Sequence, residues 1–136
     1  MPVLLDTHVW LWFAEGDAEL DHKCRAAIEA ALHADGAYVS LISVWEIALL
    51  DTRRRIILSA PCVEWVNAAF SAGVIKPAEL SAEILVASTR LPGRLHADPS
   101  DSIIVATARA LDATLITRDR TLLGYGRQGH VAVLEA

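Results

Sequence analysis

The chain has 136 residues, of which 54% are hydrophobic, and its formal net charge is −5 at pH 7. This size and composition exclude a disordered chain and predict one domain over residues 1–136, and the acidic balance argues against extended nonspecific binding along a nucleic-acid backbone. No run of about 18 uncharged apolar residues occurs and no basic leader precedes Asp6, so we expect a cytoplasmic protein without a membrane span.

Short apolar runs that predict strands alternate along the chain with segments whose apolar residues recur at helical spacing. In chain order we expect a strand at 2–5, a helix from about 7, a helix at 21–34, a strand at 37–40, helices at 43–50 and 61–72, a strand at 74–76, helices at 81–91 and 99–111, and strands at 113–117 and 130–134. This alternation predicts an α/β fold with three layers (α/β/α) around a mainly parallel sheet.

Acidic residues stand where strands end or helices begin, and several have an ordinary structural interpretation. Asp6 fits the N-cap of the helix that follows the first strand, because Asp accepts from free backbone N–H groups. Ser43 and Glu46 fit a capping box, with Ser43 as the N-cap. Asp98 stands directly before Pro99, which is a strong signal for a helix start.

Two further acids are open to either a structural or a functional interpretation. Asp101 falls in the first turn of the predicted helix at 99–111, where the helix dipole favours an anion. Asp119 follows the strand that ends at Thr117, and it fits a solvated turn acid paired with Arg118 or Arg120.

The carboxyl ends of parallel strands meet at one edge of a sheet, and ligands bind there in α/β folds. Asp6 and Asp119 follow strands, while Glu46 and Asp101 begin helices that come after connections above the sheet. Four unrelated caps need not converge, whereas four ligands of a hard divalent cation must. Carboxylate oxygens suit Mg²⁺ or Mn²⁺, and such ions activate water in phosphodiester cleavage.

Four stretches in order carry a specific resemblance: LLDTHVWLW at 4–12, SVWEIALL at 43–50, DPSDSIIVATA at 98–108 and LITRDR at 115–120. Together they resemble a PIN-domain ribonuclease, and more narrowly a VapC-type toxin of a bacterial toxin–antitoxin pair. The acidic quartet of that family falls on Asp6, Glu46, Asp101 and Asp119. Many relatives carry a further acid three residues beyond the fourth, but Leu122 stands at that position here.

The resemblance implies a PIN-like fold with a five-stranded parallel sheet between helices, and an enzyme that cleaves RNA with Mg²⁺ or Mn²⁺. Asp6 and Asp101 are the first candidates for metal ligands, followed by Glu46 and Asp119. Ser43 and Thr117 match hydroxyls that stand beside the second and fourth acids, and Asp98 is a cap first and an outer group of the site second. The family also implies a homodimer and an antitoxin that blocks the site.

Other functions fit the sequence less well. A haloacid-dehalogenase-type phosphatase needs a second Asp two residues after the first, where His8 stands. A response-regulator receiver needs a lysine at a late strand end, but the only lysines are Lys23 and Lys76. The alternative that stays open is a catalytically inactive PIN-like module that binds a protein partner, although unused clustered acids would only repel one another.

Three further groups have less specific interpretations. The four tryptophans fit the core or a dimer surface better than platforms on which bases stack. Arg53, Arg54 and Arg55 form a basic turn that either is simply solvated or binds RNA phosphates or an acidic partner. Cys24 and Cys62 have no metal-binding spacing, so we expect two buried free thiols.

Overall fold

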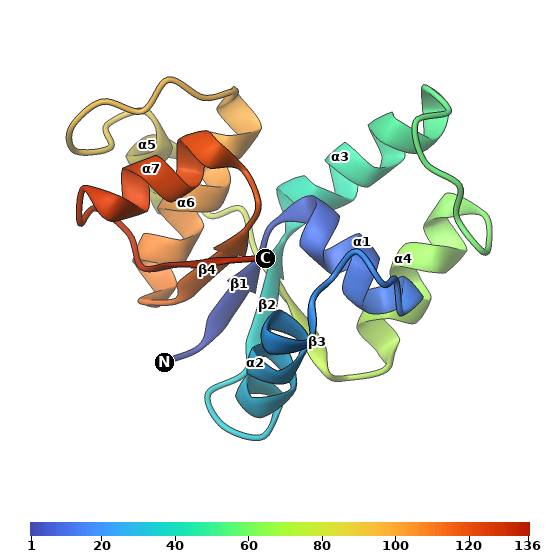
Figure 1. Ribbon diagram of the computed structural model, residues 1–136. Helices are drawn as coiled ribbons and strands as arrows, with labels where there is room; N and C mark the ends of the chain where they lie inside the picture. The colour runs from blue at the N-terminus through green and yellow to red at the C-terminus, as the bar shows by residue number, and fades with distance from the viewer.

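The computed structural model describes all residues from 1 to 136 and contains twelve helices and strands (Figure 1). They are β1 (Val3–Leu5), α1 (Thr7–Glu15), α2 (His22–Leu32), β2 (Ala37–Ser40), α3 (Leu41–Thr52), α4 (Cys62–Ser71), β3 (Ile75–Ala78), α5 (Ala82–Ser88), α6 (Pro99–Leu111), β4 (Thr114–Thr117), α7 (Arg120–Arg127) and β5 (Val133–Glu135). The five strands form one sheet in the order β3-β2-β1-β4-β5, and every pairing is parallel. The predicted three-layer α/β fold is confirmed.

The sheet lies between two groups of helices (Figure 1). The side chains of Val3 and Leu5 enter a core shared with α1, α2 and α4, whereas Leu4 enters a second core shared with α6 and α7. Successive side chains of a strand point to opposite faces, so a sheet that is covered on both faces needs an unbroken apolar run. The position of β1 at the centre of the sheet therefore explains the sequence VLL.

The N-cap of helix α3 lies three residues earlier than the sequence pattern predicted. It is Ser40, whose hydroxyl accepts from the N–H of Ile42 at 3.2 Å. Ser43 and Glu46 therefore lie inside the helix, and the predicted capping box is wrong. The strand β2 ends at Ser40 and the chain turns directly into the helix, so no loop separates the two elements. As a result, the carboxylate of Glu46 is free to bind groups other than the helix terminus.

Helix α7, whose stretch LLGYG contains two glycines, has no counterpart among the predicted elements. Its first turn is capped by Asp119, which accepts from the N–H of Leu122 at 3.0 Å. Gly126 faces Val133 of β5 so closely that a Cβ at this position would overlap the valine side chain. Glycine is needed here for close packing of the helix against the sheet edge.

The two cysteines differ in burial. Cys24 is fully buried in the first core and its thiol donates to the backbone carbonyl of Glu135 at 3.0 Å. Cys62 lies at the start of α4 and is partly exposed, so the expectation of two buried thiols is correct for Cys24 only. Both are free, as expected. None of the helices is long and apolar enough to cross a membrane.

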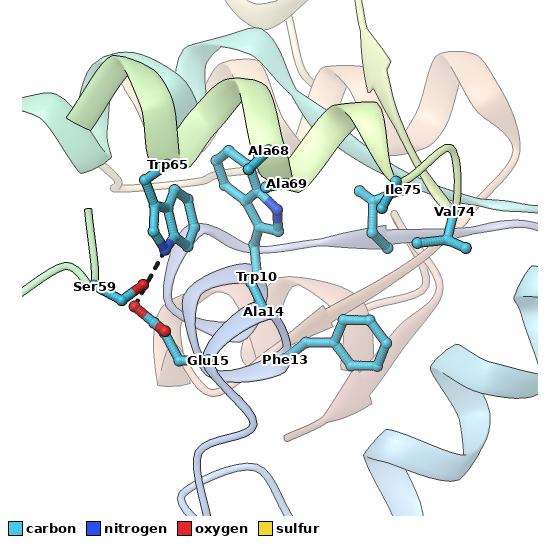
Figure 2. Close-up of a pocket in the computed structure, with 11 residues that line it drawn as sticks. Trp10, Phe13, Ala14, Glu15, Ser59, Trp65, Ala68, Ala69, Val74 and Ile75 are labelled. Atoms are coloured by element: carbon cyan, nitrogen blue, oxygen red, sulfur yellow. Dashed lines mark hydrogen bonds between the residues drawn. The ribbon is translucent and has the colours of Figure 1, made fainter. Parts of the chain in front are cut away.

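An apolar pocket of about 360 Å³ lies between α1 and α4 (Figure 2). The ring of Trp10 stacks on Phe70 with 5.1 Å between ring centroids and meets the edge of Trp65 at the same distance. The indole N–H of Trp65 donates to the carboxylate of Glu15 at 3.1 Å. This pocket belongs to the first core and contains none of the predicted site residues.

Candidate active site

All four predicted acids line one cleft of about 700 Å³ at the carboxyl edge of the sheet. Asp6 follows β1 and Asp119 follows β4, which are neighbours in the sheet. Glu46 comes from the second turn of α3, and Asp101 from the first turn of α6. The four acids therefore lie in one cleft, as the sequence predicted. Two of them follow strand ends, and the other two lie in the first or second turn of a helix.

Asp6 both caps a helix and faces the cleft. One carboxylate oxygen accepts from the backbone N–H of Thr7 at 2.9 Å, and the other accepts from the hydroxyl of Thr117 at 2.6 Å. Burial raises the pKa of Asp6, the two hydrogen bonds lower it, and the charge of Asp119 raises it. The net direction is upward, so the charged form of Asp6 is disfavoured in the protein alone. Asp6 can therefore cap α1 and still take part in the site.

Thr117 connects the first and fourth acids. Its hydroxyl donates to Asp6 and accepts from the backbone N–H of Asp119 at 3.0 Å. The expected pairing of Asp119 with an arginine is not formed, because Arg118 binds Glu19 at 2.8 Å and Arg120 makes no salt bridge. Asp119 instead uses one oxygen to cap α7 and remains exposed at the cleft.

Leu122 stands where many relatives of the resembled family carry an acid. Its side chain is fully buried in the second core, packed with residues of α6 and α7. A ligand for the cleft is therefore absent at this position, and Asp119 is the acid that the chain offers on this side of the site.

Glu46 is held by two hydroxyl groups, one of which is bound to a third. The hydroxyl of Thr7 lies 2.5 Å from one carboxylate oxygen, and Ser100 donates to the other at 3.2 Å. The hydroxyl of Ser43 lies 2.8 Å from that of Thr7, and both residues are buried. Because an ionised carboxylate only accepts, the single hydroxyl proton of Thr7 goes to Glu46, and Ser43 is left to donate to Thr7.

Two of these hydroxyls were missed by the sequence analysis, which singled out Ser43 but not Thr7 or Ser100. The sequence did contain a signal for Thr7, because it is the polar neighbour of Asp6 in an otherwise apolar run; in the structure its side chain is 3% exposed. The sequence contains no such signal for Ser100 beyond its position next to Asp101.

Asp101 is the second acid of the cleft whose pKa is raised by its surroundings. It is half-buried, and none of its oxygens accepts a hydrogen bond from the protein. Burial, together with the negative charges of neighbouring acids, raises its pKa to about 7; these acids are Asp6, Glu46, Asp119 and Asp98. No salt bridge compensates any of these acids. The centre of the cleft therefore lacks a positive charge.

Asp98 occupies the N-cap position of α6 with Pro99 in the first turn, as predicted. Its side chain forms no capping hydrogen bond, and it is exposed on the wall of the cleft. The position of the helix start is therefore confirmed, although the side chain does not stabilise it by a hydrogen bond.

The donor set of the cleft consists of carboxylate and hydroxyl oxygens, which is the type that Mg²⁺ and Mn²⁺ prefer. No group of three or more His, Cys, Asp or Glu side chains lies close enough together to hold a metal ion. This arrangement fits a Mg²⁺-type ion, which is bound through one or two carboxylates and keeps several waters or substrate phosphates in its shell.

The three arginines of the basic turn diverge. Arg53 lines the cleft, whereas Arg55 lines a separate hollow that includes Leu58 and Trp12. Arg54 adopts a left-handed backbone conformation with φ of 55°. Only one of the three candidate RNA-binding arginines thus shares a cavity with the acids.

The PIN domain model matches residues 3–127 of the chain. Ribonuclease VapC22 of Mycobacterium tuberculosis is 33% identical over 131 residues, which cover 96% of this chain and 97% of that protein. The structure of VapBC2 from Rickettsia felis bound to a promoter DNA fragment is similar, with a TM-score of 0.70, 15% identity and coverage of 99% and 98% of the two chains. FitAcB from Neisseria gonorrhoeae has a TM-score of 0.61 at 21% identity and coverage of 98% and 96%.

These similarities cover nearly the whole chain, and the matched range 3–127 spans the positions of all four acids of the cleft. The predicted likeness to VapC-type ribonucleases is confirmed. From its motifs, its sheet order and its full-length similarity, the chain belongs to the PIN domain family.

Proposed function

We propose that the chain is an endoribonuclease that depends on Mg²⁺ or Mn²⁺ and acts as the toxin of a toxin–antitoxin pair. The observation that supports this most is the uncompensated acidic cleft, in which the pKa of Asp101 is raised to about 7. Carboxylates about 5 Å apart repel by roughly 3 kcal/mol per pair at an effective dielectric near 20. A divalent cation removes this repulsion, whereas an inactive binding module gains nothing from maintaining it.

In this proposal Asp6 and Asp101 are the first ligands of the ion, and Glu46 and Asp119 complete the site directly or through water. A bound divalent ion supplies an activated water and stabilises the leaving oxygen of the cleaved phosphodiester. Thr117 fixes the orientation of Asp6 through its 2.6 Å hydrogen bond.

The hydroxyls of Thr7 and Ser100 fix the carboxylate of Glu46, each through a different oxygen. Groups that orient a ligand in this way typically contribute about 10- to 100-fold to metal affinity or activity. Near neutral pH the Asp101 carboxyl carries a proton part of the time. Binding of a cation beside it therefore releases that proton, so apparent metal affinity rises with pH.

The experiment compares the four acid-to-amide variants of the cleft in an RNA cleavage assay and in thermal melts with EDTA, Mg²⁺ or Mn²⁺. Asp6→Asn and Asp101→Asn should lose cleavage by about 100-fold or more. In EDTA they should melt at the same temperature as the wild type or higher, because one repelling charge is gone. Mg²⁺ should raise the melting temperature of the wild type much more than that of the variants.

Asp21 provides a matched control. It caps α2 by accepting from the N–H of Cys24 at 2.8 Å, as Asp6 caps α1, but it does not line the cleft. Asn caps about as well as Asp, so Asp21→Asn should leave both cleavage and melting unchanged. Full cleavage by Asp6→Asn, or wild-type cleavage that survives EDTA, would contradict the metal-dependent mechanism and leave Asp6 as a helix cap only. Absence of cleavage by the wild type in Mg²⁺ and Mn²⁺ would favour the catalytically inactive PIN-like binding module.

The second part of the proposal is a cognate antitoxin. Similar solved structures include a toxin-antitoxin complex from Klebsiella pneumoniae, which covers 86% of this chain with a TM-score of 0.57. We propose a small partner that buries an apolar helix on this domain and places a basic side chain near the acids, and that the chain also forms a homodimer. Purification of the tagged chain expressed with its neighbouring genes should yield a short second chain. Its absence from a strain in which the nuclease is fully active would contradict the partner.

A further inference from the structure

Trp45 is the tryptophan that the packing of the domain does not explain. It lies on α3 beside Glu46, its side chain is 56% exposed, and it lines the cleft that holds the acids. An exposed indole in water forgoes the stabilisation that burial of an aromatic side chain brings. Its position in the catalytic cleft therefore calls for a ligand.

The other three tryptophans all have partners. Trp10 is stacked on Phe70, and the indole N–H of Trp65 is bound to Glu15. The ring of Trp12 is covered by the guanidinium of Arg118 at 4.3 Å from the centroid. Trp45 has neither an aromatic neighbour, nor a cation over its ring, nor a hydrogen bond. Both the face and the N–H of this indole are unoccupied.

The face of α3 that carries Trp45 continues along the cleft. Trp45, Leu49 and Arg53 follow one another at intervals of four residues, so they form one stripe on the helix, and all three line the cleft. Arg53 lies about 12 Å along the helix axis from Trp45 and forms no salt bridge. The indole ring of Trp45 thus lies next to the acids, and the unpaired guanidinium of Arg53 lies farther along the same side of the cleft.

We infer that Trp45 stacks on an unpaired base beside the cleaved phosphodiester, and that Arg53 binds a backbone phosphate farther along the same strand. The inference rests on the proposed ribonuclease function and adds the two residues that hold the strand beside the acids. Aromatic platforms combined with cations along a groove are the usual means of binding single strands without strict sequence preference. A base within a duplex does not offer a free face for such stacking.

A second copy of the chain is the competing occupant of this surface. The residues that line the cleft around Trp45 are mostly charged or polar, with only three hydrophobic side chains among fourteen. The buried centres of homodimer interfaces are depleted in charged residues, so an interface centred on Trp45 would bury several acids without partners. An RNA strand instead brings phosphates to Arg53 and its base to the indole.

The experiment measures binding of two fluorescein-labelled probes by anisotropy in Mg²⁺, in the full chain carrying Asp6→Asn. One probe is a twelve-nucleotide oligoadenylate, and the other is a twelve-unit chain of abasic ribose phosphates. Trp45→Ala should weaken binding of the oligoadenylate by about 5- to 150-fold, the change that corresponds to about 1–3 kcal/mol for one stacked base. Binding of the abasic chain should change less than about twofold, and Trp45→Phe should retain most of the affinity for the oligoadenylate.

Val63→Ala is the control variant, because Val63 is an exposed hydrophobic residue of α4 that does not line the cleft. It should bind both probes as the parent does. With Asp6 restored, Trp45→Ala should raise KM for RNA cleavage and leave kcat nearly unchanged, since stacking is the same in the ground and transition states.

Equal losses for the two probes, or no loss for either, would overturn the inference. A shift from dimer to monomer in sedimentation of Trp45→Ala, with unchanged affinity per monomer for the oligoadenylate, would also overturn it and assign Trp45 to an interface between copies. Because binding is measured without cleavage, this result is independent of the metal-dependent activity. Cleavage of the oligoadenylate by the Asp6→Asn parent would count against the proposed function alone.

Discussion

Helix α1 contributes to two hollows that are built in opposite ways. Its first turn, with Thr7 and His8, lines the cleft of about 700 Å³, whose other walls carry five acids. Its later turns, with Trp10 and Phe13, line the pocket of about 360 Å³ against α4, where nine of eleven lining residues are hydrophobic (Figure 2). The single stretch LLDTHVWLW therefore serves both.

The two hollows act on stability in opposite directions. In the cleft, several carboxylates stand together without a salt bridge, so the free energy of unfolding is reduced until an ion binds. In the apolar pocket, aromatic rings stack and bury their surface, which stabilises the fold. The packing of the apolar pocket thus offsets the repulsion between the acids of the cleft. Substitutions in the two hollows should therefore change the free energy of unfolding of the metal-free protein in opposite directions.

The largest effect on stability is expected at Trp10, which is fully buried. Trp10→Ala should reduce the free energy of unfolding by about 3–5 kcal/mol, because it removes the ring and leaves a cavity. Trp10→Phe should cost much less, because it keeps an aromatic ring and removes the indole N–H, the one buried polar side-chain atom without a hydrogen-bond partner. Urea unfolding in EDTA measures both. Equal losses in the two variants would contradict this prediction, because the phenylalanine ring would then restore none of the lost packing.

The next largest effect is expected at Thr7, on the cleft side of the same helix. Thr7→Val keeps the shape of the side chain but removes the hydroxyl that binds Glu46, and it should reduce RNA cleavage by about 10- to 100-fold. Thr7→Ser keeps the hydroxyl and should retain most of the activity. Steady-state cleavage assays with saturating Mg²⁺ test the pair. Equal activity of the valine and serine variants would show that the hydroxyl does not position the carboxylate.

The sequence predicted the acids better than it predicted the groups that hold them. Asp6, Glu46, Asp101 and Asp119 could be found because topology brings strand ends and the following helix starts to one edge, whatever the side chains do in detail. The hydrogen bond from Thr7 to Glu46 joins residues 39 positions apart. Such a contact depends on how α1 and α3 pack, and no periodicity in the chain encodes it.

The errors in the elements have similar causes. The pattern Ser43-x-x-Glu46 looks like a capping box, but Ser40 lies where β2 ends and caps the helix first. Gly124 and Gly126 lower the intrinsic helix propensity of α7, yet packing against β5 requires a glycine at position 126. In both places the tertiary arrangement overrode a valid local preference.

A smaller effect is expected from the titration of Asp101. Its pKa is about 7 in the folded chain and 3.8 without the fold, so between these values the folded state holds the extra proton. Stability of the metal-free protein should therefore fall as pH rises from about 4 to about 7. Because Asp101 is only half-buried, solvent screening limits the change to a few degrees in melting temperature.

Asp101→Asn is the control for this pH dependence, measured by thermal melts in EDTA. The variant lacks the titrating group, so the difference in melting temperature between variant and wild type should grow in favour of the variant as pH rises. Asp6, whose pKa is also raised, leaves a residual slope of the same sign in both proteins. A difference that stays constant between pH 5 and pH 8 would mean that Asp101 titrates normally.

The smallest effect concerns the two arginines that the fold separates. Arg53 lines the cleft with the acids, whereas Arg55 lines the hollow beside Trp12. Each phosphate contact to a single strand contributes about −0.7 to the slope of log K against log salt. Arg53→Ala should therefore make that slope less steep by about 0.7 for every RNA sequence tested, while Arg55→Ala leaves it unchanged. Equal slope changes in the two variants would mean that the whole basic turn contacts RNA, and unchanged slopes in both would mean that the turn is only solvated.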